Sequence, residues 1–320
     1  MSNLQKLSMN MPETGEGSRN RNVPGITTLI TTLPAEIAFM PELYMLTLSN
    51  NRLTSHPVSI WLEKLEFAFA NSPFDQTKSS KVELSNNQLT DSVWPQLVRL
   101  TKVKILLMTG NNFSHIPSEV GRLTRLTKLT VGGNGGLNAS STIPAELGRL
   151  TSLTHLQLEG LGITSIPPSI SRRLTQLQTL ILDGNSITEF PSTAMMPKLT
   201  SLQLHDNDLT WFPARVLAAM PNISTLILRG NALTWFPAAA LAMTPKLLTL
   251  DLHDNHLVDF ESPANHQRDR ISILNHLSDF NHLSEVGLSE LVLSQNRLTA
   301  VPTFVGQLQH LEVRWQCCHM

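Results

Sequence analysis

The side chains that could do chemistry concentrate in the second half of the chain. Two triplets, His205-Asp206-Asn207 and His253-Asp254-Asn255, place imidazole next to carboxylate, and both groups bind zinc. The triplets are separated by two units of a short sequence repeat, or about 10 Å if each unit adds one strand to a sheet. Zinc requires each ligand atom at about 2 Å. The triplets therefore cannot share one ion, and we expect neither a metal nor a cofactor.

Sequence signatures of catalysis are absent. The chain contains no G-x-x-x-x-G-K-[ST] loop for phosphates, no G-x-S-x-G nucleophile turn and no H-E-x-x-H metal motif. The glycine-rich run at 132–136 occupies a turn of the repeat, where a phosphate loop would need a strand before it and a helix after it. We therefore expect the protein not to be an enzyme.

The polar side chains of the middle and late repeats are predicted to share one exposed face. They are His155, Gln157, Glu159, Asp183, Gln203, His205, Asp206, Arg229, Asp251, His253 and Asp254. Such a face can simply be solvated, but exposed charge around an arginine can also steer and orient a partner. These residues are our candidates for binding a protein.

Two tryptophans occupy equivalent positions. Trp211 and Trp235 both follow Leu-Thr and precede Phe-Pro, so they should stack one repeat apart at the rim of the same face. Half-buried packing is the plain interpretation. The alternative is an aromatic contact site, because tryptophan is enriched at the centres of interfaces.

The elements that position these residues follow from the repeat L-x-x-L-x-L-x-x-N-x-L-T-x-φ-P, where φ is apolar. One copy runs from Leu177 to Pro191 and the next from Leu199 to Pro213. Leucines at the fourth and sixth positions alternate with variable residues, which indicates a strand with one buried face. Stacked copies bury these leucines in one interior. The asparagine amide, with two donors and an acceptor, can bond the backbone of the turn.

Ten copies can be counted by the asparagine position, where Leu161 stands in once. The other nine positions are Asn51, Asn87, Asn111, Asn134, Asn185, Asn207, Asn231, Asn255 and Asn296. Most are 22 to 27 residues apart, but two intervals of 36 and 41 residues indicate insertions near 65–78 and 261–285. In the second insertion, Ile273, Leu277 and Phe280 are spaced like one helical face. We expect local helices on the back of the repeats, or alternatively a second contact site.

These copies resemble the leucine-rich repeat family over roughly residues 26–312. The L-T-x-φ-P copies are similar to intracellular Ras-associated and scribble-like repeats, while Ile143-Pro144-Ala-Glu-Leu147-Gly-Arg-Leu150 also resembles plant-type repeats. The resemblance implies an α/β fold, a right-handed solenoid shaped like a horseshoe, with a parallel concave sheet of about ten to eleven strands. It also implies that a partner binds on the concave face, and it carries over no catalytic residue.

The chain divides into a degenerate N-terminal repeat or cap (1–34), the solenoid (35–312) and a C-terminal tail (313–320). A net charge of −1, from 24 basic and 25 acidic residues, does not call for nucleic acid. No apolar run approaches the roughly 18 residues of a membrane span. The only cysteines are adjacent, Cys317 and Cys318, and no apolar signal segment is present, which favours a cytoplasmic setting. The last four residues have only the outline of a prenylation box.

The main functional hypothesis is a monomeric, non-enzymatic intracellular scaffold that binds a protein on its concave face, in signalling. One alternative is an ectodomain fragment of a receptor, or a secreted recognition or inhibitor protein, which would be extracellular. Another alternative is the regulatory module of a larger enzyme such as a kinase.

Overall fold

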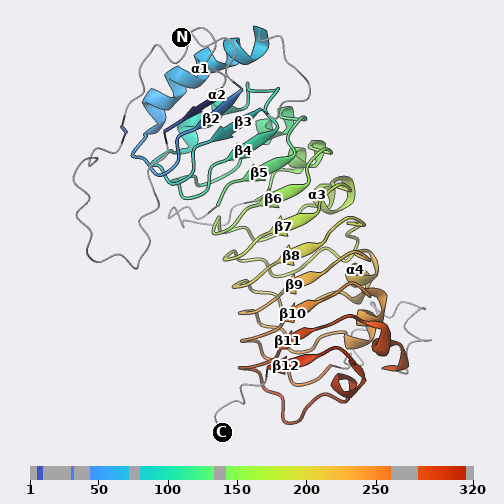
Figure 1. Cartoon of the computed structure of the whole chain (residues 1–320). Coiled ribbons are helices and arrows are strands. Elements are labelled where there is room, and N and C mark those ends of the chain that lie inside the picture. The colour runs from blue at the N-terminus through green and yellow to red at the C-terminus, as the bar shows by residue number, and fades with distance from the viewer. Residues whose placement is uncertain are drawn as a thin grey trace.

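A single parallel sheet organises the chain in the computed structural model, which describes residues 6–9, 30–31, 44–71, 80–132, 142–260 and 280–314. Twelve strands follow one another in chain order (Figure 1). They are β1 (Lys6–Ser8), β2 (Met45–Thr47), β3 (Lys81–Glu83), β4 (Ile105–Leu107), β5 (Lys128–Thr130), β6 (His155–Gln157), β7 (Thr179–Ile181), β8 (Ser201–Gln203), β9 (Thr225–Ile227), β10 (Thr249–Asp251), β11 (Glu290–Val292) and β12 (Glu312–Arg314).

Each strand pairs with the next without any shift in register. Leu156 of β6 lies opposite Leu180 of β7, which lies opposite Leu202 of β8. These central leucines are fully buried, whereas the residues on either side of them point to the other face, as the two-residue period predicts. The solenoid expected from the repeat is confirmed. Its sheet has one or two strands more than the expected ten to eleven, because the incomplete copies around Leu7 and Val313 each pair as a strand.

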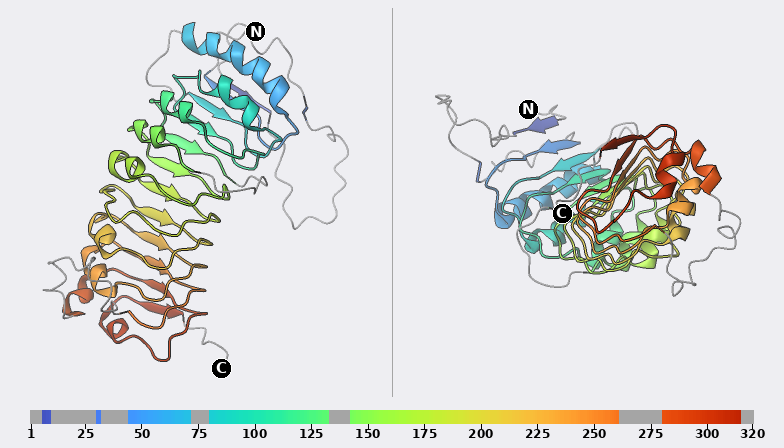
Figure 2. Two further views of the ribbon diagram at one scale, coloured as in Figure 1. Left: turned by 180° about the vertical axis from the view of Figure 1, so that it is seen from behind. Right: turned by 90° about the horizontal axis from the view of Figure 1, so that it is seen from below.

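Short helices cover the side opposite the sheet (Figure 2). They are α1 (Ser55–Asn71), η2 (Asp91–Val93), α2 (Trp94–Leu97), η3 (Ser118–Arg122), η4 (Ala145–Arg149), α3 (Pro168–Arg173), α4 (Ala214–Ala218), η5 (Ala238–Met243), η8 (Phe280–Glu285) and η9 (Thr303–Gln307). A proline stands immediately before six of them, as at Pro144 before η4 and Pro213 before α4. Proline suits this position because a first helical turn leaves its N–H groups unpaired.

The two expected insertions are only partly described. Helix α1, the longest helix of the described part, packs against η2 and α2 and covers the first half of the interval near 65–78. Residues 72–79 and 261–279 lie outside the described residues, and so do Ile273 and Leu277. Helix η8 begins at Phe280.

The asparagines form a continuous ladder inside the turns. The Nδ2 of Asn207 donates to the carbonyls of Leu182 and Leu204, at 3.0 and 3.1 Å, and its Oδ1 accepts the N–H of Ile187 at 3.0 Å. Asn185, Asn231 and Asn255 repeat this pattern. The ladder gives each coil a partner for backbone groups that would otherwise be buried unpaired.

The ladder lacks an asparagine at Leu161, but the asparagine of the next coil still bonds the backbone there. Leu161 is buried, at 6% exposure, and its own N–H donates to Oδ1 of Asn185 at 3.0 Å. The same oxygen accepts the N–H of Ile163, also at 3.0 Å. One amide oxygen of Asn185 thus accepts from two backbone donors of the coil that contains Leu161. Asn134 lies outside the described residues.

The residue before each ladder position adopts a left-handed conformation. Asn86 has φ of 54°, Gly184 has 62°, Asp206 has 54° and Asp254 has 50°. Glycine, asparagine and aspartate are the residues that tolerate this region best. The leucine and asparagine pattern alone did not predict this conformation, although Gly, Asn or Asp recurs before the asparagine and indicates it.

Candidate functional site

The predicted site residues share the exposed face of β6 to β10 and the turns that follow. His155 and Gln157 belong to β6, Gln203 to β8 and Asp251 to β10. Glu159, Asp183, His205, Arg229 and His253 each lie two residues beyond the third residue of their strands, and Asp206 and Asp254 follow in the turns. Because the strands are paired in register, these residues form columns across the coils.

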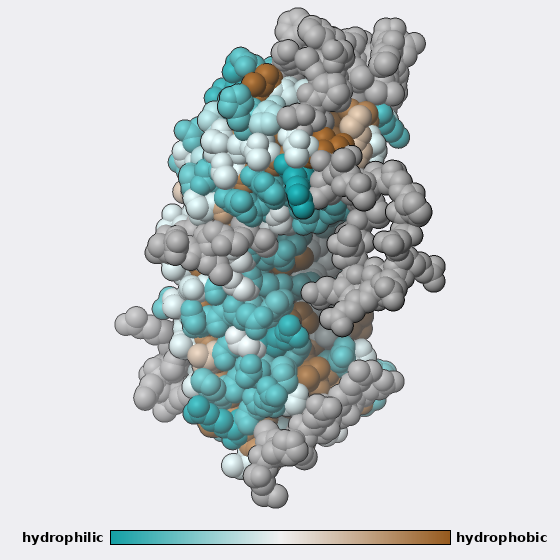
Figure 3. All heavy atoms as spheres, turned by 90° about the vertical axis from the view of Figure 1, so that its left-hand side faces the viewer, coloured by the Kyte–Doolittle hydropathy of each residue, from teal (hydrophilic) through white to brown (hydrophobic). Residues whose placement is uncertain are grey.

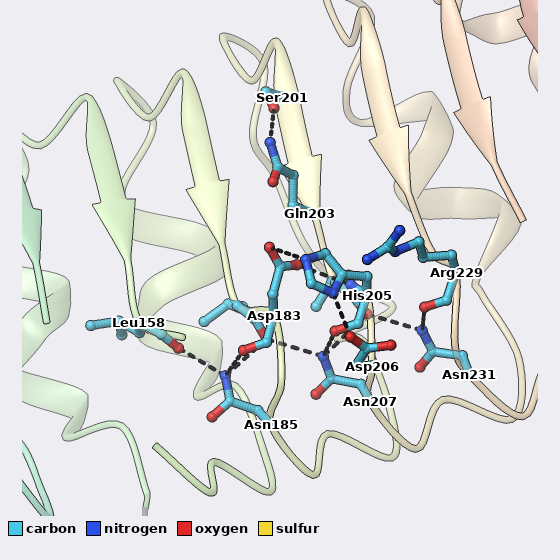
Figure 4. A network of polar contacts seen from close by, with 12 residues as sticks. Leu158, Asp183, Asn185, Ser201, Gln203, His205, Asp206, Asn207, Arg229 and Asn231 are labelled. Atoms are coloured by element: carbon cyan, nitrogen blue, oxygen red, sulfur yellow. Dashed lines mark hydrogen bonds and ion pairs between the residues drawn. The ribbon is translucent and has the colours of Figure 1, made fainter. Parts of the chain in front are cut away.

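Three of these residues form one polar cluster (Figure 4). The Nε2 of His205 lies 3.0 Å from Oδ2 of Asp183, and its Nδ1 lies 2.9 Å from Oδ2 of Asp206. The backbone N–H of His205 also donates to Oδ1 of Asp183 at 2.9 Å. Each ring nitrogen of His205 therefore lies next to a carboxylate. Both carboxylates can accept a hydrogen bond from the ring only when the imidazole carries two protons.

Burial sets the electrostatics of this cluster. Asp183 is 5% exposed, and burial raises the pKa of its carboxyl to about 6, an effect that the positive charge and the backbone N–H of His205 oppose. The nearby carboxylates of Glu159 and Asp206 act in the same direction as burial. Sequence reasoning placed these residues on one face but did not identify the contact, since Asp183 and His205 come from neighbouring coils.

The second His-Asp-Asn triplet makes different contacts. The Nδ1 of His253 lies 2.7 Å from the hydroxyl of Ser294, and its backbone N–H donates to Oδ1 of Asp251 at 2.9 Å. His155 contacts the hydroxyl of Thr154 through Nδ1 at 2.8 Å. Burial lowers the pKa of His155, and the charge of Lys128 acts in the same direction. The described residues contain no group of three His, Cys, Asp or Glu side chains arranged to hold a metal ion.

Three charged side chains on this face remain unpaired. Glu159, Arg229 and Asp254 make no side-chain hydrogen bond or ion pair with the described part of the chain. Arg229 and Asp254 are exposed, and Glu159 is half-buried. In the side view of Figure 3, hydrophilic residues run along the long axis of the molecule with isolated hydrophobic positions between them. The coloured residues on that side are mostly hydrophilic.

The two equivalent tryptophans differ in exposure. Trp211 is half-buried, whereas Trp235 is 3% exposed, and its backbone bridges to Asp259 in the next coil. The ring of Trp235 therefore offers little surface to a partner.

One surface cluster has the composition of a catalytic triad. The Nδ1 of His115 lies 3.2 Å from Oδ2 of Asp91 and 3.3 Å from Oγ of Ser114, and that hydroxyl also donates to Asp91. A relay needs one ring nitrogen for the serine and the other for the aspartate. Here the same nitrogen faces both, so the cluster does not have the geometry of a relay.

The chain is thus a parallel solenoid, a class of protein that presents an extended surface, and its exposed sheet face carries charged side chains. A family profile described as "Leucine rich repeat" matches residues 151–209 and 197–257. Residues 151–257 of the chain therefore consist of leucine-rich repeats. No curated protein sequence matches it.

Solved structures with the same fold come from bacteria and plants. A leucine-rich repeat protein of Leptospira interrogans is 23% identical with a TM-score of 0.70, over 98% of this chain and 73% of that one. The ectodomain of the Arabidopsis thaliana receptor kinase GASSHO1/SCHENGEN3, in complex with CASPARIAN STRIP INTEGRITY FACTOR 2, is 22% identical with a TM-score of 0.61, over 89% and 34% of the two chains. The Arabidopsis receptor kinase HAESA, in complex with the peptide hormone IDA and the co-receptor SERK1, is 24% identical with a TM-score of 0.56, over 89% and 47%.

These likenesses establish the fold. This chain spans about a third of the GASSHO1 ectodomain and under half of the HAESA chain. Among the helices of the described residues, none combines the length and the apolar character needed to cross a membrane.

Proposed function

We propose that the chain is a non-enzymatic module that binds a protein partner on the concave face of β6 to β10. Leucine-rich repeat proteins are protein–protein interaction modules. The location is supported by three charged side chains of both signs on the exposed sheet face, which have no side-chain partner among the described residues. They are Glu159, Arg229 and Asp254. Charges of both signs on a regular backbone can steer and orient another protein.

Charge reversal on the two faces of the solenoid tests this proposal. Arg229→Glu and Asp254→Lys alter the sheet face, while Arg215→Glu and Arg149→Glu alter exposed positions in helices α4 and η4 on the opposite face. Partners identified by cross-linking in cells are purified, and their dissociation constants are measured for each variant. We expect only the sheet-face variants to weaken binding. If Arg215→Glu weakens binding as much as the sheet-face variants do, the partner binds elsewhere.

We propose a cytoplasmic setting in signalling, because the sequence contains only two cysteines, Cys317 and Cys318, and they are adjacent. An extracellular receptor fragment or secreted recognition protein is the second candidate, because the GASSHO1 neighbour is a receptor ectodomain. Asn112, in Asn112-Phe-Ser, is exposed and would be open to glycosylation there. A mobility shift of the cellular protein on deglycosylation, lost in Asn112→Gln, would decide for the second candidate.

The regulatory module of a larger enzyme is a third candidate, since GASSHO1 and HAESA are receptor kinases. Sequencing full-length transcripts that contain these residues tests it, because a catalytic segment in the same reading frame would establish this organisation.

A further inference from the structure

The charges on the sheet face fall into two groups with different availability. Asp183, His205 and Asp206 bond one another, so each of them already has a partner inside the protein, although the side chain of Asp206 is 60% exposed. The backbone N–H of His253 already occupies one oxygen of Asp251. Glu159, Arg229 and Asp254 have no such partner in the described part of the chain. A ligand can therefore pair most directly with the charges of Glu159, Arg229 and Asp254.

The three available charges alternate in sign along the axis of the solenoid. Glu159 follows β6, Arg229 follows β9 and Asp254 follows β10, which gives the order negative, positive, negative. Arg229 forms no ion pair with either acidic turn beside it, Asp206 or Asp254. Gly132 makes room for Glu159, because a Cβ at Gly132 would lie 2.4 Å from Cγ of that side chain.

We propose that this surface takes an extended segment of a protein partner that carries a basic residue, an acidic residue four positions away and a second basic residue two positions beyond it. The proposal rests on the proposed function, and it names the chemistry of the partner. The segment lies along the solenoid axis, with its bases on Glu159 and Asp254 and its acid on Arg229. If the partner segment binds in the opposite direction, its basic, acidic and basic residues occur in the reverse order along its sequence.

The spacing follows from the register of the sheet. Glu159 and Arg229 are three coils apart, or about 14 Å at about 4.8 Å per strand, and Arg229 and Asp254 are about 5–6 Å apart. An extended chain advances about 3.3 Å per residue, so these separations correspond to about four and about two residues. Both numbers are even, which places all three partner side chains on the same face of an extended segment.

The residues between Glu159 and Arg229 in the same column are Asp183 and His205, which bond one another. Ile181, Gln203 and Ile227, the third residues of β7, β8 and β9, form the neighbouring column, and all three are half-buried. They can contact the side chains or backbone of the segment without opposing its charge pattern. Nucleic acid is not favoured, because Arg229 is the only Lys or Arg at the strand and turn positions of β6 to β10 that face outward.

A library of random twelve-residue peptides displayed on phage, selected against the full chain at low salt, tests the proposal. We expect the enriched peptides to carry the base–acid–base spacing. Binding of a synthetic enriched peptide, measured by fluorescence anisotropy, should weaken about tenfold or more with Arg229→Glu. Replacing the acid of that peptide by lysine should restore its affinity for the Arg229→Glu protein. Arg215→Glu, on the opposite face, serves as the control, and circular dichroism confirms the fold of each variant.

Two outcomes separate this inference from the proposed function. If Gln203→Arg on the sheet abolishes binding of the enriched peptides but Arg229→Glu does not weaken it, the charge pattern is wrong and the location of the site stands. If no enriched peptide responds to any sheet-face variant, both the charge pattern and the proposed location are wrong.

Discussion

Replacing Asn231 by alanine tests the asparagine ladder as the element that holds the coils together. The side chain is 7% exposed. Its Nδ2 donates to the carbonyls of Leu204 and Leu228, both at 2.9 Å, and to that of Arg229 at 3.2 Å, while Oδ1 accepts the N–H of Leu209 at 3.0 Å. Alanine removes all of these bonds and leaves a small buried gap.

The loss of stability in Asn231→Ala depends on which backbone groups keep another hydrogen-bond partner. The carbonyl of Leu204 still accepts from Asn207 at 3.1 Å, and that of Leu228 from Asn255 at 3.0 Å. The N–H of Leu209 loses its only hydrogen bond to the described residues. A buried donor without a partner costs about 1–3 kcal/mol, and each lost neutral bond about 1 kcal/mol. We therefore expect the free energy of unfolding to fall by about 2–4 kcal/mol.

Urea denaturation followed by circular dichroism measures this loss, and hydrogen exchange at the Leu209 amide locates it. The matched control is Asn222→Ala, which also removes an amide that donates to a carbonyl, that of Pro197 at 2.7 Å, and that accepts from Nζ of Lys246 at 2.7 Å, but both of these bonds are exposed to solvent. The control should change the stability by less than about 0.5 kcal/mol. An Asn231→Ala loss no larger than that of the control, with the Leu209 amide still protected, would refute the reasoning.

Three further predictions concern packing, backbone conformation and pH. Gly148→Ala should destabilise the protein by about 1–3 kcal/mol, because the new Cβ would lie 2.8 Å from the carbonyl oxygen of Ser169. Gly306→Ala, where nothing lies within 4 Å of the new Cβ, is the control, and equal effects on the melting temperature would contradict the packing argument. Gln295→Gly should raise the free energy of unfolding by about 0.5–1 kcal/mol, since Gln295 holds a φ of 55° that costs glycine little; a loss measured in urea would show that its side chain matters more. The raised pKa of Asp183, about 6, means that the folded protein keeps a proton that the unfolded chain releases near pH 4. The contribution of this group is therefore largest below pH 4 and declines as the pH rises to about 6. Asp183→Asn should remove that decline, and identical pH profiles of stability for the two proteins would contradict the assignment.

Much of the fold was predictable because it is local and repeated. The leucine pattern specified strands that can be buried only by stacking, and the asparagines specified the turns, as the bonds of Asn185 and Asn207 confirm. The strand count was less predictable. The copies around Leu7 and Val313 lack most of the motif, yet each pairs with a neighbouring strand, because backbone pairing requires no particular side chain.

The candidate site was predictable only as a face. Alternation within each strand placed the eleven polar residues together, but it did not show which of them bond one another. Trp211 and Trp235 make the same point, since identical local sequences led to equal expected exposure. The structure buries Trp235 to 3% and leaves Trp211 half-buried, because exposure depends on the neighbouring coil as well as on the residue's own.

The sequence by itself determined the architecture of this protein, since most copies carry the leucines, asparagine and proline that make one coil. Only the tertiary structure decided the chemistry of the surface. His205 and His253 occur in identical His-Asp-Asn triplets, yet the first lies between two carboxylates and the second contacts Ser294. The physical reason is that a side chain on this sheet meets residues from adjacent coils, more than twenty positions away in the sequence. Within the described part of the chain, those contacts give Asp183, His205 and Asp206 partners and leave Glu159, Arg229 and Asp254 without a side-chain partner.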